Sequence, residues 1–175
     1  MVDLEVFHVD GLWWARLQDR QWRCAIGRGG ITNSKREGDG ATPVGNWPLR
    51  KILFRPDKIS GPSSATTDLS WETIHQDDGW CDDPSHACYN EAVKLPFVAS
   101  HEELWRADDL YDIVGVLGYN DRPPIPGAGS AIFLHVASPD YGPTEGCVAL
   151  AKADLLDLLR QTNGPLVVSV RPPEA

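Results

Sequence analysis

Apolar and polar residues alternate along many short stretches of this chain, which is the pattern of half-buried β-strands. The clearest example is the pair LEVFHVDG and LWWARLQ, which meet at Asp10 and Gly11, residues typical of a tight hairpin turn. Segments rich in glycine and proline separate the further strand-like stretches WRCAIGRGGI, YDIVGVLGYN, AIFLHVA and LVVSV. The sequence therefore predicts a mainly β protein built from many short strands.

One segment near the C-terminus has a helical period instead. Ala151, Leu155, Leu158 and Leu159 recur at the spacing of one helix face. The residues at 163–165, Asn-Gly-Pro, form a combination that ends helices. We therefore expect one or two helices beside two packed, mixed sheets.

The chain shows no internal repeat and no linker, so residues 1–175 are expected to form a single domain. Residues 56–92 are rich in proline, aspartate, serine and tryptophan, and we expect a long irregular insertion there. Long loops of compact domains are often functional. This insertion is therefore expected to cover a binding site.

Charge is unevenly distributed along the chain. The net charge of −9 argues against a nucleic-acid partner. Residues 16–58 hold ten Lys or Arg against four Asp or Glu, whereas residues 68–121 hold two against thirteen. The two regions are either differently solvated faces or complementary to a substrate with carboxylates and an amine.

Neither a membrane span nor a signal peptide is visible. No apolar run approaches the ~20 residues that cross a bilayer. The start, MVDLEVFHVDGLWW, lacks a cationic segment followed by an apolar one. The protein is expected either to stay in the cytoplasm or to have lost a leader.

The cysteines and histidines do not form a recognisable metal motif. The spacing of the four cysteines matches no zinc ribbon or redox motif. Cys81 and Cys88 either form a disulfide or remain thiols. The segment IHQDDGWCDDPSHACYN has irregular spacing that fits no common zinc site, so we expect no metal and no cofactor.

The stretch PTEGCVAL places Cys147 after a turn of small residues, as a nucleophile requires. The period of two in AIFLHVA puts Phe133 and His135 on one strand face, and His135 lies twelve residues before Cys147. The intervening loop can bring this imidazole to the thiol, and a cysteine nucleophile needs such a base. Gly146 lets the backbone approach a substrate, and its N–H can face a developing oxyanion. Spacing alone leaves an inert cysteine as the alternative.

The stretch IFLHVASPDYGPTEGCVAL resembles the catalytic motif of the L,D-transpeptidases, the YkuD-type catalytic domain. In that motif a histidine is followed, after a loop, by Ser/Thr-His-Gly-Cys. The residues that match it are His135, Thr144, Gly146 and Cys147. Upstream, GDGATPVGNW resembles the family's Thr-Pro-x-Gly turn through Thr42, Pro43 and Gly45. The resemblance covers roughly residues 20–170.

The sequence also departs from this pattern. Glu145 stands where the family has its second histidine, and Val136 where a glycine follows the first. Ala149 replaces the common Arg or Asn, and the loop from histidine to cysteine is shorter than usual. These differences indicate a divergent subgroup with its own acceptor preference, for example 1-3 rather than 3-3 cross-links.

The resemblance implies a cysteine acyltransferase that cross-links peptidoglycan stem peptides, which would be both donor and acceptor. Cys147 would attack an L,D bond, with His135 as base, and the carbonyl of Val136 is one candidate to orient the imidazole. The N–H groups of Gly146 and Cys147 would form the oxyanion hole. The location implied is the periplasm or cell envelope, with a role in cell wall biogenesis and cell shape.

Five further residues are candidate substrate contacts: Arg36, Trp80, Tyr119, Thr144 and Glu145. Trp71 and Trp80 of the insertion are expected to supply apolar contacts, and its acidic residues to face the acceptor amine. The alternatives are an L,D-carboxypeptidase, a cross-link-cleaving peptidase, or a non-catalytic wall-binding module. If Cys147 is an active nucleophile, we expect it to react with iodoacetamide faster than the other three cysteines.

Overall fold

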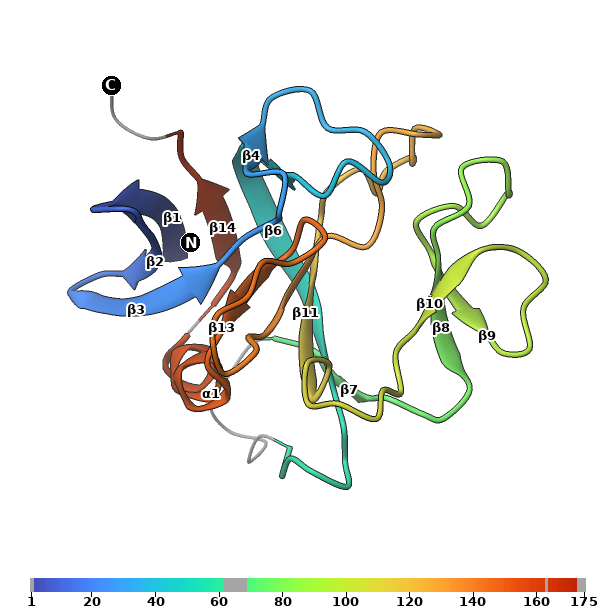
Figure 1. Ribbon diagram of the computed structural model, residues 1–175. Helices are drawn as coiled ribbons and strands as arrows, with labels where there is room; N and C mark the ends of the chain where they lie inside the picture. Colours follow the sequence, from blue (N-terminus) through green and yellow to red (C-terminus); the bar gives the residue numbers. More distant parts are fainter. Residues whose placement is uncertain (1, 62–68, 163, 173–175) are drawn as a thin grey trace.

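The computed structural model describes residues 2–61, 69–162 and 164–172 (Figure 1). Within these ranges the chain forms fourteen strands and one helix. Nine of the strands join in one sheet: β1 (Val2–Val9), β2 (Leu12–Leu17), β3 (Arg20–Ala25), β6 (Gly45–Phe54), β7 (Trp71–Thr73), β11 (Ile113–Leu117), β12 (Phe133–Val136), β13 (Val148–Leu150) and β14 (Leu166–Val170).

The sheet has the order β11-β12-β13-β3-β2-β1-β14-β6-β7 and curls on itself, because β6 also pairs with β11. The first half of β6 pairs with β14 and its second half with β11. Three neighbouring pairs are parallel, namely β1–β14, β12–β13 and β6–β7. The predicted mainly β fold with mixed sheets is confirmed, although most of the strands belong to one curled sheet.

The predicted hairpin is present, with β1 and β2 joined at Asp10 and Gly11. Both residues have a left-handed backbone, with φ of 51° and 77°. Asp-Gly adopts such turns readily because glycine carries no Cβ and aspartate tolerates positive φ.

The predicted helix is also present, as α1 (Lys152–Gln161). It buries Leu155, Leu158 and Leu159 against the sheet, as their spacing predicts. Asn163 lies outside the described residues, while Gly164 follows with a positive φ of 97°. The helix therefore covers one end of the curled sheet (Figure 1).

Strand β12 separates two apolar clusters. Leu134 and Val136 point into the main core, which is enclosed by the curled sheet and α1. Phe133 faces the other way, into a second cluster that includes Cys147. The alternation expected from the sequence therefore decides which side chains of this strand reach the second cluster.

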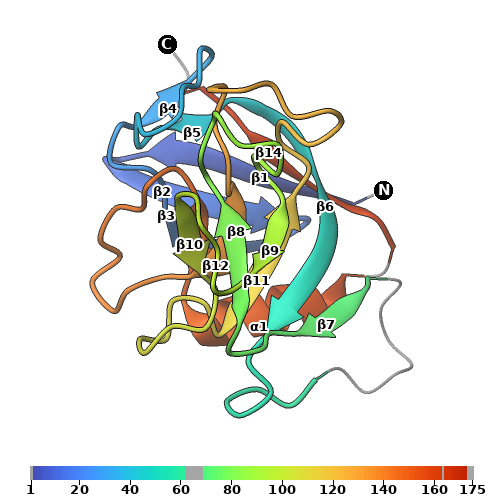
Figure 2. The ribbon, with the colours of Figure 1, turned by 90° about the vertical axis from the view of Figure 1, so that its right-hand side faces the viewer.

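A separate three-stranded sheet lies over β11 and β12 (Figure 2). This accessory sheet has the order β10-β8-β9 and consists of β8 (Asp78–Cys81), β9 (Ala92–Lys94) and β10 (His101–Glu103). The ring of Trp80 from β8 packs on that of Phe133 from β12, with centroids 5.2 Å apart. The second cluster is therefore the layer between the two sheets.

The segment 56–92 is less irregular than the sequence predicts, because it contains β7 and β8. Residues 62–68 of this segment lie outside the described part. Each strand is short and gains its pairing from distant partners: β7 from β6, and β8 from β9 and β10. Such pairing leaves little local pattern in a sequence. A two-stranded sheet of β4 (Ile31–Thr32) and β5 (Thr42–Pro43) completes the fold.

Candidate functional site

The parallel pairing of β12 with β13 brings His135 and Cys147 to one face of the sheet. Leu134 lies opposite Val148, and His135 opposite Ala149. Side chains two residues apart on a strand share a face, so Cys147 points to the same side as His135. The two residues are only 5% and 6% exposed. Both line one cavity of about 650 Å³.

A network of hydrogen bonds around Thr144 holds the turn that presents Cys147. The backbone N–H of Thr144 donates to the carbonyl of Ile26 (2.9 Å), and its carbonyl accepts from the N–H of Arg28 (2.8 Å). Its hydroxyl donates to the carbonyl of Cys147 (2.7 Å) and accepts from the N–H of Gly146 (3.2 Å). Thr144 therefore has a clear structural role, and the predicted oxyanion donor at Gly146 is engaged within the turn.

Gly146 adopts a backbone that other residues avoid, with φ of 133°. A Cβ at this position would lie 2.8 Å from the carbonyl oxygen of Ala41. Only glycine fits here without moving one of the two segments. The residue type matched in the family motif is therefore required by the geometry of the turn.

The thiol of Cys147 is held by two main-chain groups. Its Sγ donates to the carbonyl of Ala131 (3.2 Å) and accepts from the N–H of Phe133 (3.3 Å). Burial raises the pKa of this thiol to about 12, because the charged thiolate loses its hydration. In the free protein the group is therefore a neutral thiol near pH 7.

The imidazole of His135 is also neutral. Burial lowers its pKa to about 4. Its Nδ1 lies 2.8 Å from the carbonyl oxygen of Val136, which can only accept a hydrogen bond, so Nδ1 carries the proton and Nε2 the lone pair. Tyr111 packs edge-on against the ring, with centroids 5.3 Å apart. The Val136 carbonyl thus occupies the orienting position considered from the sequence.

Acidic residues from the accessory sheet form one wall of the cavity. Glu102 of β10 accepts a hydrogen bond from the hydroxyl of Tyr111 (2.6 Å), and burial raises the pKa of its carboxyl. Asp82 directly follows β8, and its Oδ1 is buried without a hydrogen-bond partner among the described residues. Both line the same cavity as Cys147. This wall favours a ligand group that carries positive charge or donates hydrogen bonds.

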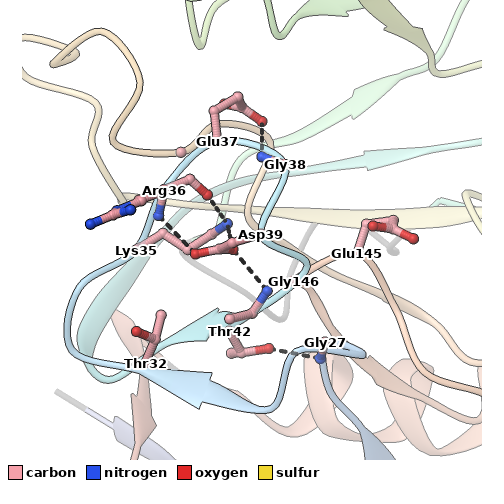
Figure 3. A network of polar contacts seen from close by, with 12 residues as sticks. Gly27, Thr32, Lys35, Arg36, Glu37, Gly38, Asp39, Thr42, Glu145 and Gly146 are labelled. Atoms are coloured by element: carbon pink, nitrogen blue, oxygen red, sulfur yellow. Dashed lines mark hydrogen bonds and ion pairs between the residues drawn. The ribbon is translucent and has the colours of Figure 1, made fainter.

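The loop from residue 33 to 41 (Figure 3) also lines the cavity, through Lys35, Glu37 and Gly38. The carboxylate of Asp39 accepts from the ammonium of Lys35, from the N–H of Arg36 (2.8 Å) and from the N–H of Ala41 (2.9 Å). The Thr42 hydroxyl accepts from the N–H of Gly27 (2.9 Å). The Thr-Pro-x-Gly element therefore anchors this loop beside the turn of Cys147.

Two of the predicted substrate contacts lie at the cavity and three do not. Thr144 and Glu145 line it together with the Cys147 and His135 side chains. Glu145 pairs with the Arg28 guanidinium at 3.0 Å in an exposed ion pair, a type that contributes little to stability.

The other three candidates have different surroundings. The Trp80 indole is buried and donates to Oδ1 of Asn90 (3.0 Å). The Tyr119 hydroxyl donates to the carbonyl of Ala128 (2.6 Å). Arg36 is exposed and lies outside the residues that line the cavity. Conversely, Glu102 and Tyr111 line the cavity although no local motif marks either of them.

Three observations bear on metals, redox chemistry and membranes. The described ranges contain no group of three or more His, Cys, Asp or Glu side chains placed to hold a metal ion. All four cysteines are free thiols. No helix in this part of the chain is long and apolar enough to cross a bilayer.

Comparison with known proteins identifies the family of the chain. No curated protein matches the chain significantly. The family model YkuD, described as the L,D-transpeptidase catalytic domain, matches residues 9–169, which is nearly the whole chain. The chain therefore belongs to the YkuD family of L,D-transpeptidase catalytic domains.

Proposed function

We propose that this protein is a peptidoglycan L,D-transpeptidase that acts through a cysteine acyl-enzyme, with Cys147 as nucleophile and His135 as general base. The supporting observation is that both side chains lie on one face of neighbouring parallel strands and line one cavity. The family acts on peptidoglycan peptides, which supports an activity at the cell envelope.

The proposed reaction has two halves. In the first, Nε2 of His135 takes the thiol proton as Sγ attacks the carbonyl carbon of an L,D bond. The terminal D-residue leaves as an amine with that proton, and a thioester remains. In the second, the amine of a neighbouring stem attacks the thioester and gives its proton to Nε2. The new amide forms, and the proton returns to Sγ.

Cys147 and His135 are both neutral in the free protein, so the thiol proton moves to the imidazole only when substrate is bound. With a thiol pKa of about 12 and an imidazole pKa of about 4, an ion pair is strongly disfavoured in the free protein. Proton transfer therefore accompanies attack on a bound substrate. This corrects the expectation of fast iodoacetamide labelling, because Cys147 is buried and protonated whereas Cys88 is half-exposed. Slow labelling of Cys147 is compatible with the proposed mechanism.

The acidic wall favours an amine rather than water as the group that resolves the thioester. Asp82 and Glu102 come from the accessory sheet and can accept hydrogen bonds from an ammonium group. Binding a cation beside the thioester raises the local concentration of the acceptor. We therefore propose cross-linking over hydrolysis as the main outcome.

The test is incubation of purified tetrapeptide and tripeptide muropeptides with the wild-type protein and with Cys147→Ala, followed by mass spectrometry. We expect a dimer formed with loss of the terminal D-residue, absent with Cys147→Ala. Fragmentation of the dimer distinguishes a 1-3 from a 3-3 cross-link. Trimmed monomers without dimers would instead identify a carboxypeptidase. Unchanged muropeptides with both proteins would overturn the catalytic proposal in favour of a wall-binding module.

A further inference from the structure

Two segments distant in sequence meet behind the thiol of Cys147. The segment 89–90 leads from the accessory sheet, and the segment 129–131 leads into β12. The Tyr89 hydroxyl accepts from the N–H of Gly129 (3.0 Å), and Oδ1 of Asn90 accepts from the N–H of Ala131 (2.9 Å). Two backbone donors, separated by Ser130 alone, are therefore bound by neighbouring side chains of the accessory segment.

The side chain of Asn90 is buried and uses its full hydrogen-bonding capacity. Oδ1 also accepts from the indole of Trp80 (3.0 Å). Nδ2 donates to the carbonyls of Tyr119 (3.0 Å) and Asn120 (2.8 Å). A fully paired amide in the interior is held in one orientation. Asn90 is thus a fixed support for the Ala131 peptide.

Ala131 needs such a support. Its φ is 52°, in the left-handed region that residues other than glycine seldom adopt. Conformations of this kind persist when the surrounding structure imposes them, and they cluster at functional sites. The N–H of Ala131 is bound by Asn90, while its carbonyl accepts the proton of the Cys147 thiol (3.2 Å).

We propose that Asn90 is a positioning residue for the nucleophile: by fixing the Ala131 peptide, it aims the carbonyl that receives the Cys147 thiol hydrogen. The description of Cys147 as nucleophile rests on the proposed function. The geometric relation between Asn90 and the thiol does not. The accessory sheet thereby contributes to the alignment of the thiol as well as to the wall of the cavity.

Other groups that influence the thiol do not bond to Asn90. The charged and titratable side chains that line the cavity together with the thiol are Lys35, Glu37, Asp82, Glu102, Arg106, Tyr111, His135, Asp140 and Glu145. None of the hydrogen bonds of Asn90 involves these side chains. Among the described hydrogen-bond partners of the Asn90 side chain, Ala131 is the one that also bonds the thiol.

The test measures alkylation of Cys147 against pH in Asn90→Gly, with iodoacetamide and peptide mass spectrometry. Glycine removes the side chain and tolerates the φ of 59° at this position. When the Ala131 carbonyl is no longer held in place, water can reach the thiol. Hydration by this water stabilises the thiolate. Because alkylation follows the thiolate fraction, we expect labelling at pH 8 to increase about tenfold or more.

The matched control is Asn120→Gly. Asn120 also has a left-handed backbone (φ 49°), and its side chain also braces a loop, through Ile125 and Gly129. It makes no hydrogen bond to Ala131, so we expect labelling of Cys147 within about twofold of wild type. A folded Asn90→Gly with the wild-type profile, or the same increase in Asn120→Gly, would overturn the proposal.

If Asn90→Gly does not fold, Asn90→Asp carries the test, because it keeps the acceptor for the Ala131 N–H and loses the two bonds that Nδ2 donates to the carbonyls of Tyr119 and Asn120. We expect Cys147 in Asn90→Asp to be labelled as slowly as in wild type, because the Ala131 peptide stays in place. A tenfold increase in this labelling would contradict the positioning role. Alkylation needs no peptidoglycan. A positive result here beside inactive wild-type protein would therefore refute the proposed function and leave the positioning role intact.

Discussion

At the residue scale, the backbone of Gly146 decides where the thiol of Cys147 stands. A methyl group at Gly146 would meet the carbonyl of Ala41 at 2.8 Å, in a conformation with φ of 133°. We expect Gly146→Ala to shift the turn and reduce the proposed cross-linking about 100-fold, the usual effect of a misplaced reacting group. Initial rates with muropeptides measure this. The control is Gly127→Ala, since Gly127 also has a positive φ but has open space around it. This variant should keep its cross-linking activity.

Asp82 carries a more specific prediction about the acceptor. Asp82 lines the cavity, and its buried Oδ1 has no hydrogen-bond partner within the described part of the chain. We expect Asp82→Asn to raise KM for the acceptor amine about tenfold, the effect of losing a charge-assisted hydrogen bond. Release of the terminal D-residue should change little.

Asp140 provides the comparison for Asp82. It also lines the cavity, but its carboxylate accepts from the Ser138 hydroxyl (2.7 Å) and the N–H of Gly142 (3.1 Å). Asp140→Asn should therefore leave KM for the acceptor unchanged. Equal effects of the two substitutions on KM would show that the cavity responds to net charge alone.

At the scale of secondary-structure elements, Asp112 joins α1 to the start of β11. Its side chain is fully buried, and the Lys152 ammonium at the first residue of α1 lies 2.5 Å from Oδ2. Lys58 Nζ lies 2.9 Å from Oδ1 as an ion pair. We expect Asp112→Asn to lower the free energy of unfolding by about 3 kcal/mol, because two cations then lose a buried partner. Urea denaturation measures the change.

Asp109, the exposed partner of Lys58, provides the control for Asp112. Lys58 also pairs with Asp109, whose side chain is 69% exposed. Solvent screens such a pair, so Asp109→Asn should change the free energy of unfolding far less than Asp112→Asn does. A loss of equal size in both variants would mean that burial of Asp112 is not what makes its ion pairs important.

These elements also show which parts of the site the sequence can predict. The period of two in AIFLHVA places His135 on the correct face, and the spacing of Leu155, Leu158 and Leu159 predicts α1, because both are local patterns. Asn90 meets Ala131 across 41 residues, and no local pattern records that contact. The position of Trp80 outside the residues that line the cavity has the same origin, since a distant ring, Phe133, packs on it.

At the scale of the whole molecule, burial of His135 links the stability of the fold to pH. The folded pKa of about 4 lies below the ordinary value of 6.5 that the unfolded chain regains. Between these two values the unfolded state binds a proton that the folded state excludes, so stability is full above 6.5 and is lost as pH falls towards 4. One such group contributes about 1.4 kcal/mol per pH unit to the free energy of unfolding.

We therefore expect the wild-type protein to lose about 3 kcal/mol through this group between pH 6.5 and pH 4. His135→Gln keeps a donor for the Val136 carbonyl but cannot take up the proton, so its stability should fall less steeply over the same range. Cys147→Ala should follow the wild-type curve, because the thiol stays protonated throughout this window. Urea denaturation at closely spaced pH values measures all three. Parallel curves for wild type and His135→Gln would mean that the imidazole titrates in the folded protein as it does in water, and burial would then not be what keeps His135 neutral.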